Sequence, residues 1–147
     1  MIKLVLVMLL ALVASPGPAA GQPSKGTPKA KAKTTSDLVI SEITFTPKSP
    51  GKESVLIHGN RSFAPAAFAI EEGKPRFVID IKDTGPVKRE LSRITTDGQF
   101  IERIRSFYHK ENRTLRVVLD LHPSKKYRIS QFFYQAQNIY AVEVEGE

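Results

Sequence analysis

Residues 76–81 read RFVIDI, and residues 116–121 read RVVLDL. The two stretches lie forty residues apart and share the pattern R-(F/V)-V-(I/L)-D-(I/L). Successive side chains of a β-strand point to opposite faces of the sheet, so apolar residues at every second position indicate a strand with one buried face. The repeat therefore predicts two strands, each with three apolar residues facing the core and Arg, Val and Asp facing outward.

The rest of the chain after residue 37 also has the pattern of a β protein. Short runs rich in Val, Ile, Phe and Tyr recur between turn residues, which is typical of a sandwich or barrel. The expected strands are 38–46, 53–59, 66–71, 75–82, 100–108, 113–121, 127–133 and 138–145. One segment, 86–94, fits a short helix because Pro86 lies near its first turn and its apolar residues recur at helical spacing.

These patterns predict an all-β fold, a two-sheet β-sandwich of about eight strands with internal pseudo-symmetry and one short helix. We expect each sheet to carry one copy of the repeat. The six apolar residues of the two copies would then line the core from two sides, and each outer face would present one set of Arg, Val and Asp to solvent.

The outward residues of the repeat are the candidate ligand-binding residues: Arg76, Val78, Asp80, Arg116, Val118 and Asp120. An Arg and an Asp four positions apart in one strand are separated by roughly 13 Å, so they cannot neutralise each other within that strand. Two interpretations stay open. The charges form ion pairs with neighbouring strands, or they are held apart to hydrogen-bond a long polar ligand.

The N-terminal 37 residues differ from the rest in composition. Residues 1–20 combine Lys3 with an unbroken apolar run from Leu4 to Val13 and small residues before position 21, which predicts a cleaved signal peptide. Residues 21–37 contain Pro, Gly, Ser, Thr, Ala and Lys but no large apolar residue. This segment is therefore predicted to be a disordered basic linker, which either attracts anionic polymers or only maintains solubility.

Composition limits the chemistry of the chain. Among 147 residues there is no Cys, and there are only three His. Disulfides, thiolate nucleophiles and Cys-ligated zinc are thereby excluded, and the three His lack metal-ligand spacing. We expect a non-enzymatic binding domain without a cofactor or a metal. The net charge of +7 falls to about +3 over residues 38–147, so nucleic acid is not an expected partner.

Two further groups of side chains are candidates for a binding surface. Arg103 and Arg105 share one face of an expected strand and would extend an anion-binding surface. In the run Phe132, Phe133 and Tyr134, alternation forces at least one ring to face away from the others. An outward ring would stack on a sugar or on a partner protein.

The doubled motif R-x-V-x-D-(I/L), with Val55-Leu56-Ile57, Phe68-Ala69-Ile70 and the segment Ile101 to Ile104 before its copies, resembles the AMIN domain over nearly all of 38–147. The resemblance implies a two-sheet β fold with the motifs on its outer faces. It also implies a non-catalytic periplasmic module, as in N-acetylmuramoyl-L-alanine amidases and type IV pilus secretins, that binds peptidoglycan.

We therefore expect an exported periplasmic or cell-envelope protein that recognises peptidoglycan or another wall polymer. After signal cleavage it would have no integral membrane span. The alternative is a protein–protein adaptor of a pilus, secretin or other envelope assembly that docks through an exposed strand edge.

Overall fold

The computed structural model of the chain describes residues 37–147. The predicted signal peptide, and all of the predicted linker except Asp37, lie outside the described residues. Within residues 37–147, no helix has the length and apolar character needed to cross a membrane.

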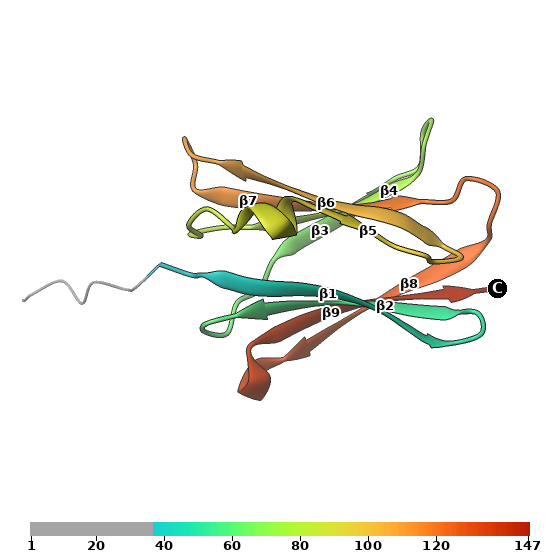
Figure 1. Cartoon of the computed structure of the whole chain (residues 1–147), viewed down its shortest axis with the longest axis horizontal. Coiled ribbons are helices and arrows are strands. Elements are labelled where there is room, and N and C mark those ends of the chain that lie inside the picture. The colour runs from blue at the N-terminus through green and yellow to red at the C-terminus, as the bar shows by residue number, and fades with distance from the viewer. Residues whose placement is uncertain (1–36) are drawn as a thin grey trace, which may run out of the picture. The chain divides into compact units, whose positions relative to one another are not determined.

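Two antiparallel sheets form the fold, one above the other (Figure 1). The four-stranded sheet has the order β1 (Ile40–Ser49), β2 (Lys52–Gly59), β9 (Ile139–Gly146) and β8 (Tyr127–Tyr134). The five-stranded sheet has the order β3 (Ala66–Ile70), β4 (Arg76–Ile81), β7 (Thr114–Leu121), β6 (Ile101–His109) and β5 (Arg93–Thr95). The all-β, two-sheet prediction is confirmed, and each of the eight expected strands has a counterpart in this list.

The helix expected over 86–94 is wrong. A single 3₁₀ turn, η1 (Arg89–Ser92), is followed at once by the short strand β5. In β5, Ile94 lies opposite Ile104 of β6 and faces the core. Pairing with β6 gives this segment backbone hydrogen bonds and packs a partly buried side chain against the core, whereas an isolated helix of nine residues is too short to be stable. A second 3₁₀ turn, η2 (Gln135–Gln137), joins β8 to β9.

The core lies between the inner faces of the two sheets. The five-stranded sheet contributes the apolar residues of both repeat copies, together with Ile101 and Ile104 of β6. The four-stranded sheet supplies the opposite side with side chains from β1, β2 and β9: Ile43, Val55, Ile57, Tyr140, Val142 and Val144. Because all of these residues fall between positions 38 and 144, residues 37–147 contain their own hydrophobic core.

The two copies of the repeat lie side by side in one sheet, so the expectation of one copy per sheet is wrong. β4 and β7 pair antiparallel, with Arg76 opposite Asp120 and Asp80 opposite Arg116. Reversing one strand against the other brings the Arg of each copy beside the Asp of its neighbour. In separate sheets the copies could not complement each other in this way. The six apolar residues consequently line the core from one side only.

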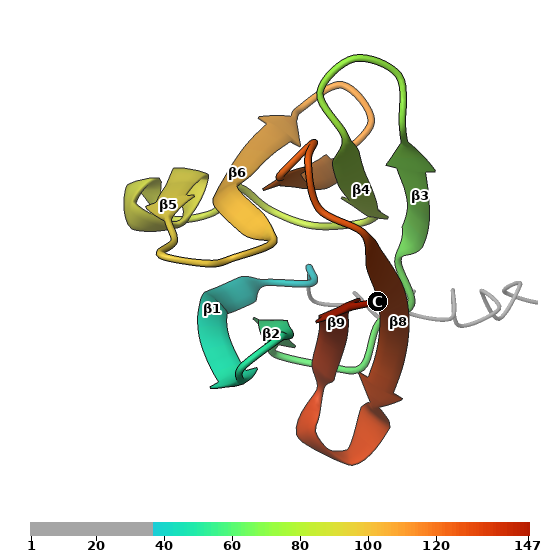
Figure 2. The ribbon, with the colours of Figure 1, turned by 90° about the vertical axis from the view of Figure 1, so that its right-hand side faces the viewer.

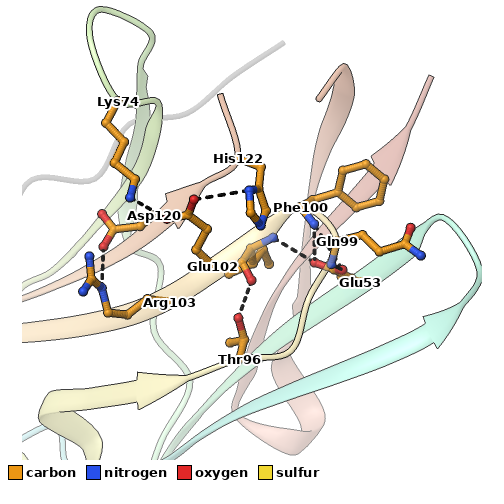
Figure 3. Close-up of polar contacts among 10 residues, drawn as sticks. Glu53, Lys74, Thr96, Gln99, Phe100, Glu102, Arg103, Asp120 and His122 are labelled. Carbon is orange, nitrogen blue, oxygen red and sulfur yellow. Dashed lines mark hydrogen bonds and ion pairs between the residues drawn. The ribbon is translucent and has the colours of Figure 1, made fainter. Parts of the chain in front are cut away.

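A buried carboxylate links the two sheets. Glu53 of β2 is only 3% exposed and accepts hydrogen bonds from three consecutive backbone N–H groups at the start of β6 (Figure 3). The donors are Gln99, Phe100 at 3.2 Å and Ile101 at 3.0 Å. A buried carboxylate needs such donors to offset its loss of hydration, so Glu53 fixes the loop before β6 against the other sheet.

Replacing this carboxylate tests its structural role. Glu53→Ala leaves three backbone N–H groups without their acceptor, and we expect a loss of about 3 kcal/mol in the free energy of unfolding. Urea denaturation of residues 37–147 measures it. The control is Glu42→Ala on the exposed side of β1, which should change stability by less than about 0.5 kcal/mol. Equal effects of the two substitutions would contradict the role given to Glu53.

Candidate ligand-binding face

The outer side of the five-stranded sheet gathers the charged residues of the repeat with arginines from its neighbours. The register places the outward side chains of β4 and β7 beside those of β6. β5 and β3 flank them and contribute Arg93 and Phe68, respectively, to the same face. We call this surface the arginine face, and its residues are Arg76, Val78, Asp80, Arg116, Val118, Asp120, Arg103, Arg105, Phe107, Arg93 and Phe68. Five arginines and two aspartates give it an excess of three positive charges.

Asp80 and Arg116 form a bidentate pair across β4 and β7. The Nε and Nη2 of Arg116 each lie 2.7 Å from a carboxylate oxygen of Asp80. Two parallel charge-assisted hydrogen bonds of this kind fix both side chains in one geometry. The hydrogen bond from Arg116 holds the pKa of Asp80 below its usual value, so this carboxylate is ionised at neutral pH.

Asp120 is held by two arginines of β6. Arg105 donates from Nε at 2.8 Å and from Nη2 at 2.7 Å. Arg103 donates from Nε at 3.0 Å, as Figure 3 shows. The side chain of Asp120 is only 1% exposed. Burial acts to raise its pKa, but the hydrogen bonds from Arg105 and Arg103 outweigh burial, and the pKa lies below its usual value. Asp120 is therefore a buried anion that orders the two guanidinium groups above it.

Arg76 has a different environment. It lies opposite Asp120 in the β4–β7 register, but the Asp120 carboxylate is engaged by the two arginines of β6. Within residues 37–147, Arg76 forms no ion pair, and its buried Nε has no hydrogen-bond acceptor. Arg93, which is exposed at the β5 edge, likewise has no ion-pair partner among these residues.

Apolar and aromatic groups complete the arginine face. Val78 and Val118 point outward but are buried beneath the longer side chains around them. Phe68 and Phe107 remain exposed. The guanidinium carbon of Arg116 lies 6.0 Å from the centre of the Phe68 ring, and that of Arg105 lies 5.7 Å from the Phe107 ring. These distances are within the range of cation–π attraction.

A further carboxylate at the rim of the arginine face is already neutralised. Glu102, at the bulge of β6, contacts Lys74 at 2.5 Å and the Nδ1 of His122 at 3.2 Å (Figure 3). The hydrogen bond from Lys74 lowers its pKa. Glu102 therefore does not neutralise the arginines beside it. Over residues 37–147 no three His, Cys, Asp or Glu side chains cluster in a way that could hold a metal ion.

The structure decides between the two interpretations of the repeat for three of its four charged residues. Asp80, Arg116 and Asp120 form ion pairs with neighbouring strands, so the expectation that they are left free for a ligand is wrong. The cross-strand alternative is confirmed for them. Arg76 alone among the four has no partner within the described chain. All six predicted site residues do lie on one outer face.

Several residues of the arginine face lie outside the doubled motif, so the sequence indicated their place on this surface less clearly. Arg103 and Arg105 were expected on one face, and they are. Phe68 and Phe107 join them because each has the outward parity of its strand. Parity alone does not identify neighbouring strands. The sequence therefore could not predict that these rings lie beside the arginines. Chemically, the arginine face offers bidentate donors for carboxylates and flat apolar rings for stacking.

The buried ion pair of Asp120 should make the stability of the fold depend on pH. Because the pKa of Asp120 is lower in the folded than in the unfolded protein, its contribution to stability is present above about pH 4 and is lost as the pH falls through the folded pKa. Asp120→Asn should lower the free energy of unfolding by about 3 kcal/mol at pH 7, and the difference from wild type should shrink below pH 4.

Urea denaturation of residues 37–147 between pH 7 and pH 3 measures this difference. The control is Asp97→Asn, an exposed carboxylate in the loop before β6, which should have little effect at any of these pH values. A cost of Asp120→Asn that stays constant with pH would contradict the ion pair as its source.

Comparison with known proteins identifies a family for the part of the chain that contains the doubled motif. Among curated proteins, none matches the chain. The family model described as the AMIN domain matches residues 42–144. This match covers more than half of the chain. It includes both copies of the repeat, all of β2 to β8, most of β1 and β9, and the whole arginine face. The chain belongs to the AMIN domain family.

Proposed function

We propose that this protein is a secreted, non-enzymatic module of the cell envelope that binds peptidoglycan through the arginine face. Family membership supports the ligand class, because AMIN domains are known as non-catalytic, peptidoglycan-binding modules of amidases and secretins. The observation that carries the site is the gathering of five arginines on one sheet face, with Arg76 and Arg93 free of ion-pair partners among residues 37–147.

The distribution of charge favours this face over the rest of the domain. Residues 38–147 have 17 basic and 14 acidic residues, an excess of three. The arginine face alone has an excess of three, so the charges elsewhere on the domain balance. A carboxylate-bearing polymer is therefore attracted to one side of the sandwich. The stem peptides of peptidoglycan carry such carboxylates at regular intervals along the polymer.

Within the proposed site, the residues have different roles. Arg76 and Arg93 provide guanidinium groups that need not leave an internal partner before they bind a ligand carboxylate. Asp80 and Asp120 position the other three arginines and do not themselves contact the ligand. Phe68 and Phe107 offer stacking surfaces for the sugar rings or peptide groups beside the carboxylates.

The position of the protein in the cell is part of the same proposal. The predicted signal peptide, residues 1–20, would export the chain across the inner membrane, which brings the domain to the wall polymer. The predicted basic linker, residues 21–37, would add a nonspecific attraction to anionic wall components.

Co-sedimentation with isolated sacculi tests the proposed site. Residues 37–147 should pellet with sacculi at low salt, and the double variant Arg76→Ala/Arg93→Ala should bind about tenfold more weakly, since one charge-assisted hydrogen bond contributes about 1.5 kcal/mol or more. The matched control, Lys126→Ala/Arg128→Ala, removes the same charge from exposed positions away from the arginine face. It should pellet like wild type.

Two results would overturn the proposal. If the wild-type protein stays in the supernatant, peptidoglycan is excluded as its ligand. Equal loss of binding in the control variant would show a dependence on net charge alone, without a site on the arginine face.

One observation favours a second candidate function, a protein–protein adaptor. Within residues 37–147, β8 pairs on one side only, so it presents an open strand edge of the kind to which extended segments of other proteins add. An adaptor without affinity for the wall would fail to pellet with sacculi.

A further inference from the structure

The two sheets have four edge strands, and three of them have features that discourage pairing with another chain. β3 and β5 are short, with five and three residues. β1 is long, but it carries Glu42, Pro47 and Lys48 and has two register irregularities. Charges, proline, bulges and short length are the usual means by which edge strands avoid unwanted pairing.

β8 has a single charged residue and none of the other features. Its eight residues, YRISQFFY, include no Pro or Lys, and their only charged side chain is that of Arg128. The register with β9 runs without a break from Tyr127 to Tyr134, so the strand has no bulge. The Tyr140 hydroxyl donates to Gln131 Oε1 at 2.6 Å and ties the middle of β8 to β9. Among residues 37–147, the other side of β8 has no strand beside it (Figure 2).

Three consecutive aromatic residues of β8 are exposed on both faces of the sheet. Phe132 and Tyr134 point outward, with ring centres 6.4 Å apart, and they are 39% and 42% exposed. Phe133 points inward, 5.0 Å from the Tyr140 ring, yet is 47% exposed. A ligand lying flat on the outer face would cover only the first two rings. An added strand covers rings on both faces, because its own side chains alternate.

We propose that β8 pairs antiparallel with β8 of a second copy of this chain, with Gln131 facing Gln131. This register pairs seven residues of each strand. It sets Phe132 against Ser130, Phe133 against Ile129 and Tyr134 against Arg128, so each large ring meets a smaller or flexible side chain. No like charges face each other, and Arg128 of each copy lies over a Tyr ring, which is a favourable arrangement.

The same pairing explains why assembly would stop at two copies. A twofold contact pairs the open β8 edge of one chain with that of the other, so neither edge remains free. The merged eight-stranded sheet would have the order β1-β2-β9-β8-β8-β9-β2-β1, with the guarded strand β1 at each end. Neither end then presents an open, uncharged strand for a third copy. The arginine face belongs to the other sheet of each copy, so it remains accessible in the pair.

Sedimentation velocity of residues 37–147 without ligand tests the inference. We expect the mass of two copies at high protein concentration and dissociation on dilution. Phe132→Lys places a charge on the edge and should weaken association at least tenfold. The matched control is Phe107→Lys, which substitutes another exposed aromatic residue, 47% exposed against 39% for Phe132, on the other sheet. It should associate like wild type.

Crosslinking tests the register independently. The chain has no Cys, so a single introduced thiol reports one contact. Facing residues of antiparallel strands have Cα atoms about 4.5–5.5 Å apart, within reach of a disulfide. Gln131→Cys should therefore give a covalent dimer under mild oxidation, and Glu42→Cys on the β1 edge should not.

The inference is overturned by a domain that remains monomeric at all concentrations, even if its β8 edge binds a strand from another envelope protein. It is also overturned if Glu42→Cys crosslinks as readily as Gln131→Cys. Both measurements are made without sacculi, so their outcome is independent of wall binding.

Discussion

The antiparallel pairing of β4 with β7 is the constraint on which the rest of the structure depends. Because both strands carry the same Arg-x-Val-x-Asp pattern, pairing them in opposite directions brings Asp80 to Arg116 at 2.7 Å. The same register places six apolar residues together on the core side. One pairing thus brings together a third of the buried hydrophobic core and the centre of the arginine face.

The strands themselves could be predicted from the sequence, but their neighbours could not. Period-two alternation in 76–81 and 116–121 fixes which residues point inward, and this prediction is confirmed. The partner of each strand depends on the rest of the chain, so nothing in either hexapeptide indicates that the two copies share a sheet. The strand β5 was not predicted for the same reason, since Ile94 packs against the core only because β6 lies beside it. Glu53 gave no local signal because its hydrogen-bond donors lie 46 to 48 positions away.

The candidate site could likewise be predicted only in part from the sequence. Residue type and parity selected Arg76, Arg116, Asp80 and Asp120, and all four lie on one face. Which of these four side chains form ion pairs with each other or with β6 depends on distances that only the fold determines. Asp120 is buried under Arg103 and Arg105, whereas Arg76 has no partner among residues 37–147. In this account the aspartates order the arginine face, and the arginines without internal partners make it a binding surface.

The most direct measurement is a titration of residues 37–147 with soluble peptidoglycan fragments, followed by the NMR signals of the arginine Nε–H groups. We expect the signals of Arg76 and Arg93 to shift first and furthest, while that of Arg128 on the other sheet stays unchanged. Shifts confined to Arg128 and the β8 edge, or no shifts at saturating fragment concentration, would contradict it.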